Sequence, residues 1–210
     1  MSGSGAVDGE LASMLSCCTM SRLWAEQDEG PYHRSGQPAR RDIVEDREGV
    51  ALQLGIRLSN ADGTPVVGCD MQIWQCDAHG NYSGFPPPDA RNANYLSDQT
   101  FLRGHQITDA AGMVEFRTIY PGWYPGRAVH IHLMVHTPAR TYTSQLYFPE
   151  EITAAVLADG VYRAHGLPDT THATDGIFAT GGQPAVLEIR PDIRGHVGLL
   201  CLLLPHEMTA

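Results

Sequence analysis

Apolar residues recur at every second position in several short stretches, and this alternation constrains the fold more strongly than any other feature of the chain. It is clearest in three runs: Leu52, Leu54, Ile56 and Leu58; Val67, Cys69, Met71 and Ile73; and Val129, Ile131, Leu133 and Val135. Successive side chains of a strand point to opposite faces, so a period of two indicates a half-buried β-strand. The chain is therefore predicted to be rich in β-structure.

Further strands are expected at 101–108, 113–119, 143–148, 186–189 and 197–204, with turns supplied by the many glycines and prolines (Gly 22, Pro 14). Residues 109–112 carry turn chemistry, so the strands on either side of them are predicted to form a hairpin. Acidic residues after Pro149 predict a short helix, and at most one more is expected near 11–23. About eight short strands with one or two short helices and long loops predict a mainly β fold, a β-sandwich.

The chain is expected to form one domain. Its 210 residues are enough to bury a core without support from a metal or a disulfide, and we find no fixed-period repeat and no linker that would divide them. Residues 1–49 are polar and weakly periodic, and they are expected to form an N-terminal arm. Residues 50–210 are expected to form the sandwich.

The charged residues exclude several classes of function. The chain has 24 acidic and 14 basic residues, which gives a formal net charge of −10, and every basic residue is arginine. Without lysine the chain cannot form a pyridoxal Schiff base, complete the Gly-Lys-[Ser/Thr] of a P-loop, or use a lysine as base or nucleophile. The acidic balance argues against a nucleic-acid partner.

The cysteines and the termini predict a cytoplasmic protein without a membrane partner, unless a secretion leader was removed. Residues 1–18 show no basic segment ahead of an apolar stretch. The longest apolar run, 197–204, is too short to span a bilayer. No Cys-x-x-Cys pair occurs, so we interpret the five cysteines as ordinary thiols of a reducing compartment: Cys17, Cys18, Cys69, Cys76 and Cys201.

His130-Ile131-His132 is the strongest candidate for chemistry. Residues i and i+2 of a strand lie on one face with Cα atoms roughly 7 Å apart, so two imidazoles can converge on one metal there. The alternative is a pair of partly exposed histidines that face solvent. The remaining histidines with no partner spacing are expected to be polar surface residues: His33, His79, His105 and His136.

The neighbouring residues decide which metal suits this pair. A zinc hydrolase with a His-x-His-x-Asp site needs an acid where Met134 stands, which disfavours that interpretation. Two tyrosines lie in suitable loops: Tyr82 follows a predicted strand, and Tyr124 lies between a glycine-rich turn and a proline shortly before the histidine strand. Taken singly, each tyrosine is equally consistent with a rim or core position.

At these residues the chain resembles the intradiol ring-cleavage dioxygenases, the catechol and protocatechuate dioxygenase family, in its compact protocatechuate-like form. Two tyrosines, an Arg-x-x-His-x-His and a downstream glutamine in this order make the resemblance specific. It spans about residues 29–150 and is carried by residues 29–32, 73–82, 116–125, 127–132 and 144–146.

The resemblance implies one ferric iron per chain, held by Tyr82 and His130 as equatorial ligands and by Tyr124 and His132 as axial ones. Phenolate is a hard anionic donor that suits the ferric charge, and the bound cation removes its proton. In the family the axial tyrosine, here Tyr124, leaves the metal and accepts a substrate proton. The implied partners are a catechol-type small molecule and O2, and the implied product is of the muconate type. Homo-oligomerisation is left open.

Arg127 matches the family's arginine that stabilises negative charge developing on the substrate, and Gln145 matches the glutamine that lies against the same region. Without the resemblance, Arg127 is equally a surface residue of a turn and Gln145 a polar strand residue. Only five residues separate Tyr124 from His130, fewer than in the well-known members, so the pocket is expected to be open or to be closed by the loop at 84–98. The alternative function is a sandwich module that binds an aromatic ligand without turnover.

Overall fold

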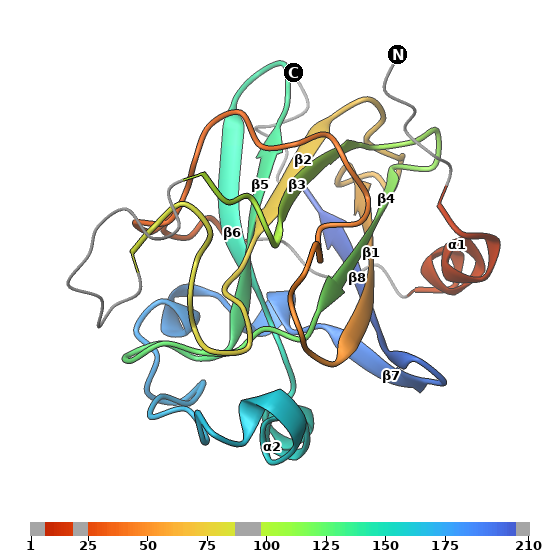
Figure 1. Ribbon diagram of the computed structural model, residues 1–210. Coiled ribbons are helices and arrows are strands. Elements are labelled where there is room, and N and C mark those ends of the chain that lie inside the picture. Colours follow the sequence, from red (N-terminus) through yellow and green to blue (C-terminus); the bar gives the residue numbers. More distant parts are fainter. Residues whose placement is uncertain (1–6, 19–24, 87–97, 205–210) are drawn as a thin grey trace.

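Two four-stranded sheets pack face to face in the computed structural model, which describes residues 7–18, 25–86 and 98–204 (Figure 1). The first sheet has the order β4-β1-β8-β7 and the second the order β3-β2-β5-β6. The predicted β-sandwich is therefore confirmed. Its strands are β1 (Ala51–Ser59), β2 (Asp70–Trp74), β3 (Arg103–Ile107), β4 (Met113–Ile119), β5 (His130–His136), β6 (Thr141–Tyr147), β7 (Glu188–Asp192) and β8 (Gly195–Leu203).

The alternating residues of the sequence form the core between the sheets. Leu54 and Ile56 of β1 and Ile131 and Leu133 of β5 are all 0% exposed and belong to one apolar cluster. Because side chains alternate along a strand, this burial turns His130 and His132 away from the core, onto the outer face of the second sheet. The core thus determines where the candidate ligands point.

The predicted hairpin between strands 101–108 and 113–119 is wrong. The turn at 109–112 does form, and the Asp109 carboxylate accepts hydrogen bonds from the backbone N–H groups of Ala111 and Met113, each at 2.9 Å. However, β3 pairs with β2 and β4 pairs with β1, so the turn carries the chain from one sheet to the other. Turn chemistry specifies a reversal of direction, whereas the choice of partner strand depends on which sheet buries each strand's apolar face.

Within the described residues, two short α-helices flank the sandwich. Helix α1 (Gly9–Ser16) begins at the N-cap Asp8, and its Leu11 and Leu15 pack against β8 on the outer face of the first sheet. Helix α2 (Glu150–Leu157) follows β6, as predicted, with Pro149 at its N-cap. Short 3-10 helices occupy Gly160–Tyr162 (η1), Phe178–Thr180 (η2) and Gln183–Ala185 (η3). In the described ranges no helix is long and apolar enough to cross a membrane.

The interpretation of all five cysteines as ordinary thiols is wrong for one pair. A disulfide joins Cys18, just past α1, to Cys201 of β8, with Cα atoms 6.3 Å apart. The two cysteines are 183 residues apart in the sequence, so only the docking of α1 onto β8 brings them together. Cys17, Cys69 and Cys76 are free thiols.

Residues 25–49, which precede β1, lie against the sandwich. Near the second sheet, the Gln27 N–H donates to the Thr143 carbonyl of β6 at 2.9 Å. Near the first sheet, the Ile43 N–H donates to the Arg117 carbonyl of β4 at 3.0 Å, and Ile43 is buried in the main core. Residues 25–49 therefore reach both sheets, and their first part crosses the outer face that carries the histidines.

Candidate active site

The outer face of the second sheet carries a buried polar row. Trp74 of β2, His132 of β5 and Gln145 of β6 are directly paired across the three strands, and each is 0% exposed. His130 pairs with Tyr147 in the next row and is 3% exposed. The alternative that the two histidines face solvent is therefore wrong, because loops cover this face of the sheet.

The loops bring both predicted tyrosines to the histidine pair. The Nε2 atoms of His130 and His132 lie 3.1 Å apart, and the Tyr124 hydroxyl lies 3.3 Å from His130 Nε2. The ring of Tyr82 lies edge-on to those of Tyr124 and His132, at centroid distances of 5.8 and 6.0 Å. The four predicted metal ligands thus form one cluster, with side chains from β5 and from two separate loops.

The histidines are held in a form that can coordinate a metal. The Nδ1 atom of His130 lies 2.7 Å from the Ala128 carbonyl, so Nδ1 carries the proton and Nε2 presents a lone pair to the cluster. Burial, together with the charge of Arg127, lowers the pKa of His130 to about 3. Burial also moves the pKa of His132 well below its ordinary value, and His130 adds to this effect. Both imidazoles are therefore neutral at physiological pH.

The tyrosines would provide the oxygen donors of the cluster. The Tyr82 hydroxyl is buried and makes no hydrogen bond to any residue that the structure describes, a state that costs about 1–3 kcal/mol. Across the described ranges, no three histidine, cysteine, aspartate or glutamate side chains come together to hold a metal, so phenolates would complete the ligand set. Two neutral imidazoles and two phenol oxygens fit a hard, highly charged cation such as ferric iron.

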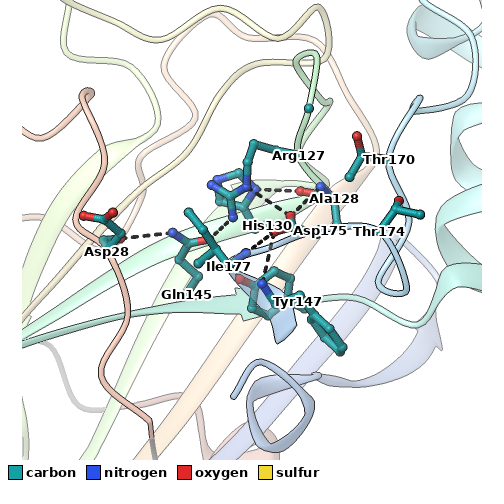
Figure 2. A network of polar contacts seen from close by, with 12 residues as sticks. Asp28, Arg127, Ala128, His130, Gln145, Tyr147, Thr170, Thr174, Asp175 and Ile177 are labelled. Atoms are coloured by element: carbon teal, nitrogen blue, oxygen red, sulfur yellow. Dashed lines mark hydrogen bonds and ion pairs between the residues drawn. The ribbon is translucent and has the colours of Figure 1, made fainter. Parts of the chain in front are cut away.

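Arg127 connects the cluster to a wider polar network (Figure 2). Its Nη1 donates to the Tyr124 hydroxyl at 3.4 Å, and its Nη2 donates to Gln145 Oε1. Gln145 Nε2 in turn donates to the Asp28 carbonyl at 3.1 Å. The two remaining residues predicted for the site, Arg127 and Gln145, thus contact each other beside Tyr124.

Asp175 also belongs to this network, although no sequence pattern predicts it as a site residue. Its carboxylate accepts a hydrogen bond from Arg127 Nε at 3.0 Å and is completely buried. Burial alone would lower the pKa of Arg127, but the negative charges of Tyr124 and Asp175 raise it above its ordinary value. Asp175 lies in a stretch that shows only loop character, so no local pattern distinguished it.

The segment at 29–34 forms a wall of the site. The ring of Tyr32 stacks on that of Tyr82 at 4.2 Å and lies edge-on to that of Tyr124 at 5.5 Å. Gly30 has φ 72°, and a Cβ there would lie 3.2 Å from His132 Cε1, so this backbone passes directly beside the imidazole. Residues 29–32 belong to the family resemblance, but no sequence pattern indicates that Tyr32 lies in the site.

Two of the histidines predicted to lie on the surface, His33 and His105, have acidic partners. His33 is half-buried rather than a surface residue, because its ring packs against Trp74 at 5.0 Å and its Nδ1 pairs with Glu29 at 2.7 Å. His105 also has an acidic partner, Asp70. Of the loop predicted to close the pocket, residues 87–97 lie outside the described residues.

Comparisons with known proteins agree on one family. The family described as Dioxygenase (Dioxygenase_C) matches residues 28–165. The chlorocatechol 1,2-dioxygenase of Rhodococcus opacus is 27% identical over 146 residues, which cover 57% of this chain and 54% of that protein. The chain spans about half the length of the curated relatives it matches.

Two solved structures are similar over almost their whole length. An intradiol ring-cleavage dioxygenase from Tetranychus urticae is 33% identical with a TM-score of 0.77, covering 89% of this chain and 94% of that one. The dioxygenase domain of a carbohydrate-binding fusion protein from Streptomyces sp. SirexAA-E is 29% identical with a TM-score of 0.66, covering 86% and 97%. With the family match over most of the sandwich, these likenesses show that the chain belongs to the intradiol ring-cleavage dioxygenase family.

Proposed function

We propose that the protein is a non-haem Fe(III)-dependent dioxygenase that inserts both atoms of O2 into a catechol-type substrate. The ring is cleaved between its two hydroxylated carbons to give a muconate-type product. One observation carries the proposal: Tyr82, Tyr124, His130 and His132 converge at one buried point. The names of the similar proteins, chlorocatechol 1,2-dioxygenase and intradiol ring-cleavage dioxygenase, support this reaction class.

The four side chains would hold one ferric ion per chain. Tyr82 and Tyr124 would supply two phenolate oxygens and His130 and His132 two imidazole nitrogens to this ion. Ferric iron supplies a Lewis acid that binds both oxygens of a catechol and makes the ring reactive toward O2. The Ala128 carbonyl fixes the His130 tautomer through Nδ1, as is usual for a metal-bound histidine.

Tyr124 is placed to move a proton. Its hydroxyl oxygen lies between His130 Nε2, at 3.3 Å, and Arg127 Nη1, at 3.4 Å. A catechol that loses a hydroxyl proton on binding needs an acceptor for it, and the Tyr124 oxygen, held as a phenolate, would be that acceptor. Arg127 beside this oxygen stabilises whichever group carries the negative charge.

The remaining residues orient the substrate and exclude water. Arg127 and Gln145 contact each other on one side of the cluster, and the guanidinium offers fixed N–H donors to charge that develops on the substrate. Tyr32 and Trp74 provide flat apolar surfaces, Tyr32 against Tyr82 and Trp74 stacked on His132 at 4.9 Å. These rings cover Tyr82 and His132 and would keep bulk water from the ligands.

The test combines metal analysis with product analysis. Protein expressed in iron-replete medium should contain one iron per chain and show the red-brown colour of tyrosinate bound to ferric iron. Oxygen uptake is then measured across a panel of substituted catechols, and the products are identified. Colourless, iron-free protein would contradict the proposal, and semialdehyde products would indicate extradiol cleavage instead.

The alternative is a sandwich that binds an aromatic ligand without turnover. In that case Tyr82→Phe and His132→Ala would leave the affinity for catechol almost unchanged, and no oxygen would be consumed. Under our proposal, both variants lose iron and oxygen uptake together.

A further inference from the structure

The carboxylate of Asp175 is buried and accepts four hydrogen bonds from described residues, all of them from N–H groups (Figure 2). One carboxylate oxygen accepts from Arg127 Nε at 3.0 Å and from the Ala128 backbone at 2.8 Å. The other accepts from the backbone N–H groups of Ile177 and Phe178, at 2.8 and 3.0 Å. The side chain is 0% exposed, so the carboxylate has no access to a substrate.

The way in which Asp175 binds Arg127 determines where the guanidinium points. The carboxylate takes the Nε edge and leaves both terminal nitrogens free for other partners. Nη1 then reaches the Tyr124 hydroxyl and Nη2 reaches Gln145 Oε1. Without this anchor the Nε edge of Arg127 would lose its charged partner, and a long side chain with several rotatable bonds would gain other rotamers that no longer present its terminal N–H groups to the cluster.

The same carboxylate also ties together two loops. Through Ala128 it holds the turn that precedes β5, and through Ile177 and Phe178 it holds the start of η2. Asp175 lies beyond residues 28–165, where the family match ends, so its role does not follow from that match. Burial alone would raise the pKa of Asp175, but hydrogen bonds from the backbone of Ala128 and Phe178 and the charge of Arg127 lower it. The group is therefore a carboxylate at neutral pH.

We propose that Asp175 is a positioning residue that fixes the Arg127 guanidinium toward Tyr124 and Gln145 for ring cleavage. The part that concerns the reaction rests on the proposed function, whereas the part that concerns the orientation of Arg127 does not. A loss of activity alone cannot separate the role of Asp175 in the reaction from its effect on the orientation of Arg127, so the test needs a second measurement.

A double-mutant cycle measures whether Asp175 acts through Arg127. Asp175→Asn is expected to lower kcat by about 10- to 100-fold, the range for a displaced positioning contact, with a much smaller change in KM. In the Arg127→Gln background the same substitution should lower kcat little further. Losses that multiply in the double variant would show that Asp175 acts independently of Arg127 and would overturn the proposal.

Asp169 provides a matched control. It lies in the same stretch, is exposed, and accepts a hydrogen bond from the Gly126 backbone at 3.1 Å, next to Arg127 but without contact to its guanidinium. Asp169→Asn should therefore leave kcat unchanged. A similar loss of kcat in Asp169→Asn and Asp175→Asn would mean that Asp175 acts by stabilising the loop rather than by orienting the Arg127 guanidinium, and would contradict the proposal.

A second measurement works without iron and without turnover. In the metal-free protein, the side-chain Nε–H resonance of Arg127 is identified by its absence in Arg127→Gln. We expect it to exchange slowly with water in the wild-type protein and in Asp169→Asn, and to broaden or vanish in Asp175→Asn. An Nε–H that stays protected in Asp175→Asn would refute the anchoring. If wild-type protein binds iron but cleaves no catechol, the proposed function fails while this measurement still decides the orientation of Arg127.

The Asn amide places an N–H group against donors in either orientation, so this variant risks misfolding. Asp175→Glu keeps the charge and every acceptor but displaces the carboxylate. It is expected to fold, to shift the Arg127 Nε–H resonance and to lower kcat. Wild-type kcat together with an unshifted resonance in this variant would contradict the proposal.

Discussion

The rings of Tyr32 and Tyr82 are stacked at a centroid distance of 4.2 Å with an angle of 10° between their planes. Tyr32 belongs to the segment before the first strand, whereas Tyr82 is a candidate metal ligand from a loop after β2. The stack therefore couples the position of a ligand to a segment that lies outside the sheets. The burial of Tyr82, at 3% exposure, depends in part on this contact.

Tyr32→Ala should weaken both the fold and the site. An aromatic pair contributes about 0.5–1.5 kcal/mol beyond its buried area, so the free energy of unfolding of the metal-free protein should fall by at least this amount. In iron-loaded protein the tyrosinate charge-transfer band should shift, because the environment of Tyr82 changes. Urea unfolding and visible absorption measure the two effects. Tyr32→Phe is the matched control, and equal stability of the two variants would show that the stack contributes nothing.

Tyr82→Phe should have opposite effects on the metal-free and the iron-loaded protein. The hydroxyl is buried without a hydrogen-bond partner among the described residues, so its removal should raise the free energy of unfolding of the metal-free protein by about 1 kcal/mol. The same change should abolish iron binding and the red-brown colour. Denaturant unfolding in the presence of a chelator measures the stability of the metal-free protein, and metal analysis measures iron binding. Retention of one iron per chain in this variant would rule out Tyr82 as a ligand.

Arg127→Ala should lose far more activity than the substitution of an arginine outside the site. Removing a fixed donor that faces developing charge typically costs about 10²- to 10³-fold in kcat. Arg190 on β7 of the other sheet is a suitable comparison, since it is half-exposed and pairs only with Glu188 among the described contacts. Steady-state oxygen uptake measures both variants. Comparable rates of oxygen uptake in the Arg127 and Arg190 variants would mean that Arg127 has no role in catalysis.

Stability at low pH should depend on Asp175. Its pKa is lowered in the folded protein from the ordinary value of 3.8, so folding favours the carboxylate form. The resulting stability is fully present above pH 4 and is lost as the pH falls through the lowered folded pKa. The titratable groups that interact with it are Arg127, His130, Tyr147 and His172.

The measurement is the free energy of unfolding of metal-free protein as a function of pH. The difference between wild type and Asp175→Asn should be constant between pH 5 and 7 and should shrink below pH 4. A difference that is independent of pH throughout the acid range would show that the charge of Asp175 contributes nothing to folding. Asp169→Asn serves again as the control.

Local spacing was sufficient to predict the sandwich and the direction of the histidines. The period of two in β1 and β5 follows from strand geometry alone, and burial of Ile131 and Leu133 then turns His130 and His132 to the other face. The family resemblance carried by the order of Tyr82, Tyr124, Arg127, the histidines and Gln145 implied which side chains would meet. Each of these inferences depends on neighbours along the chain or on a specific motif.

Contacts between distant segments could not be predicted in this way. The transfer of β3 and β4 to different sheets, the Cys18–Cys201 disulfide and the stacking of Tyr32 on Tyr82 all arise where separate segments pack together. The anchoring of Arg127 by Asp175 joins residues 48 positions apart and leaves no periodic trace in the sequence. The alternation of apolar residues indicates which face of a strand is buried in the core. Which segment covers the other face depends on how distant parts of the chain pack together.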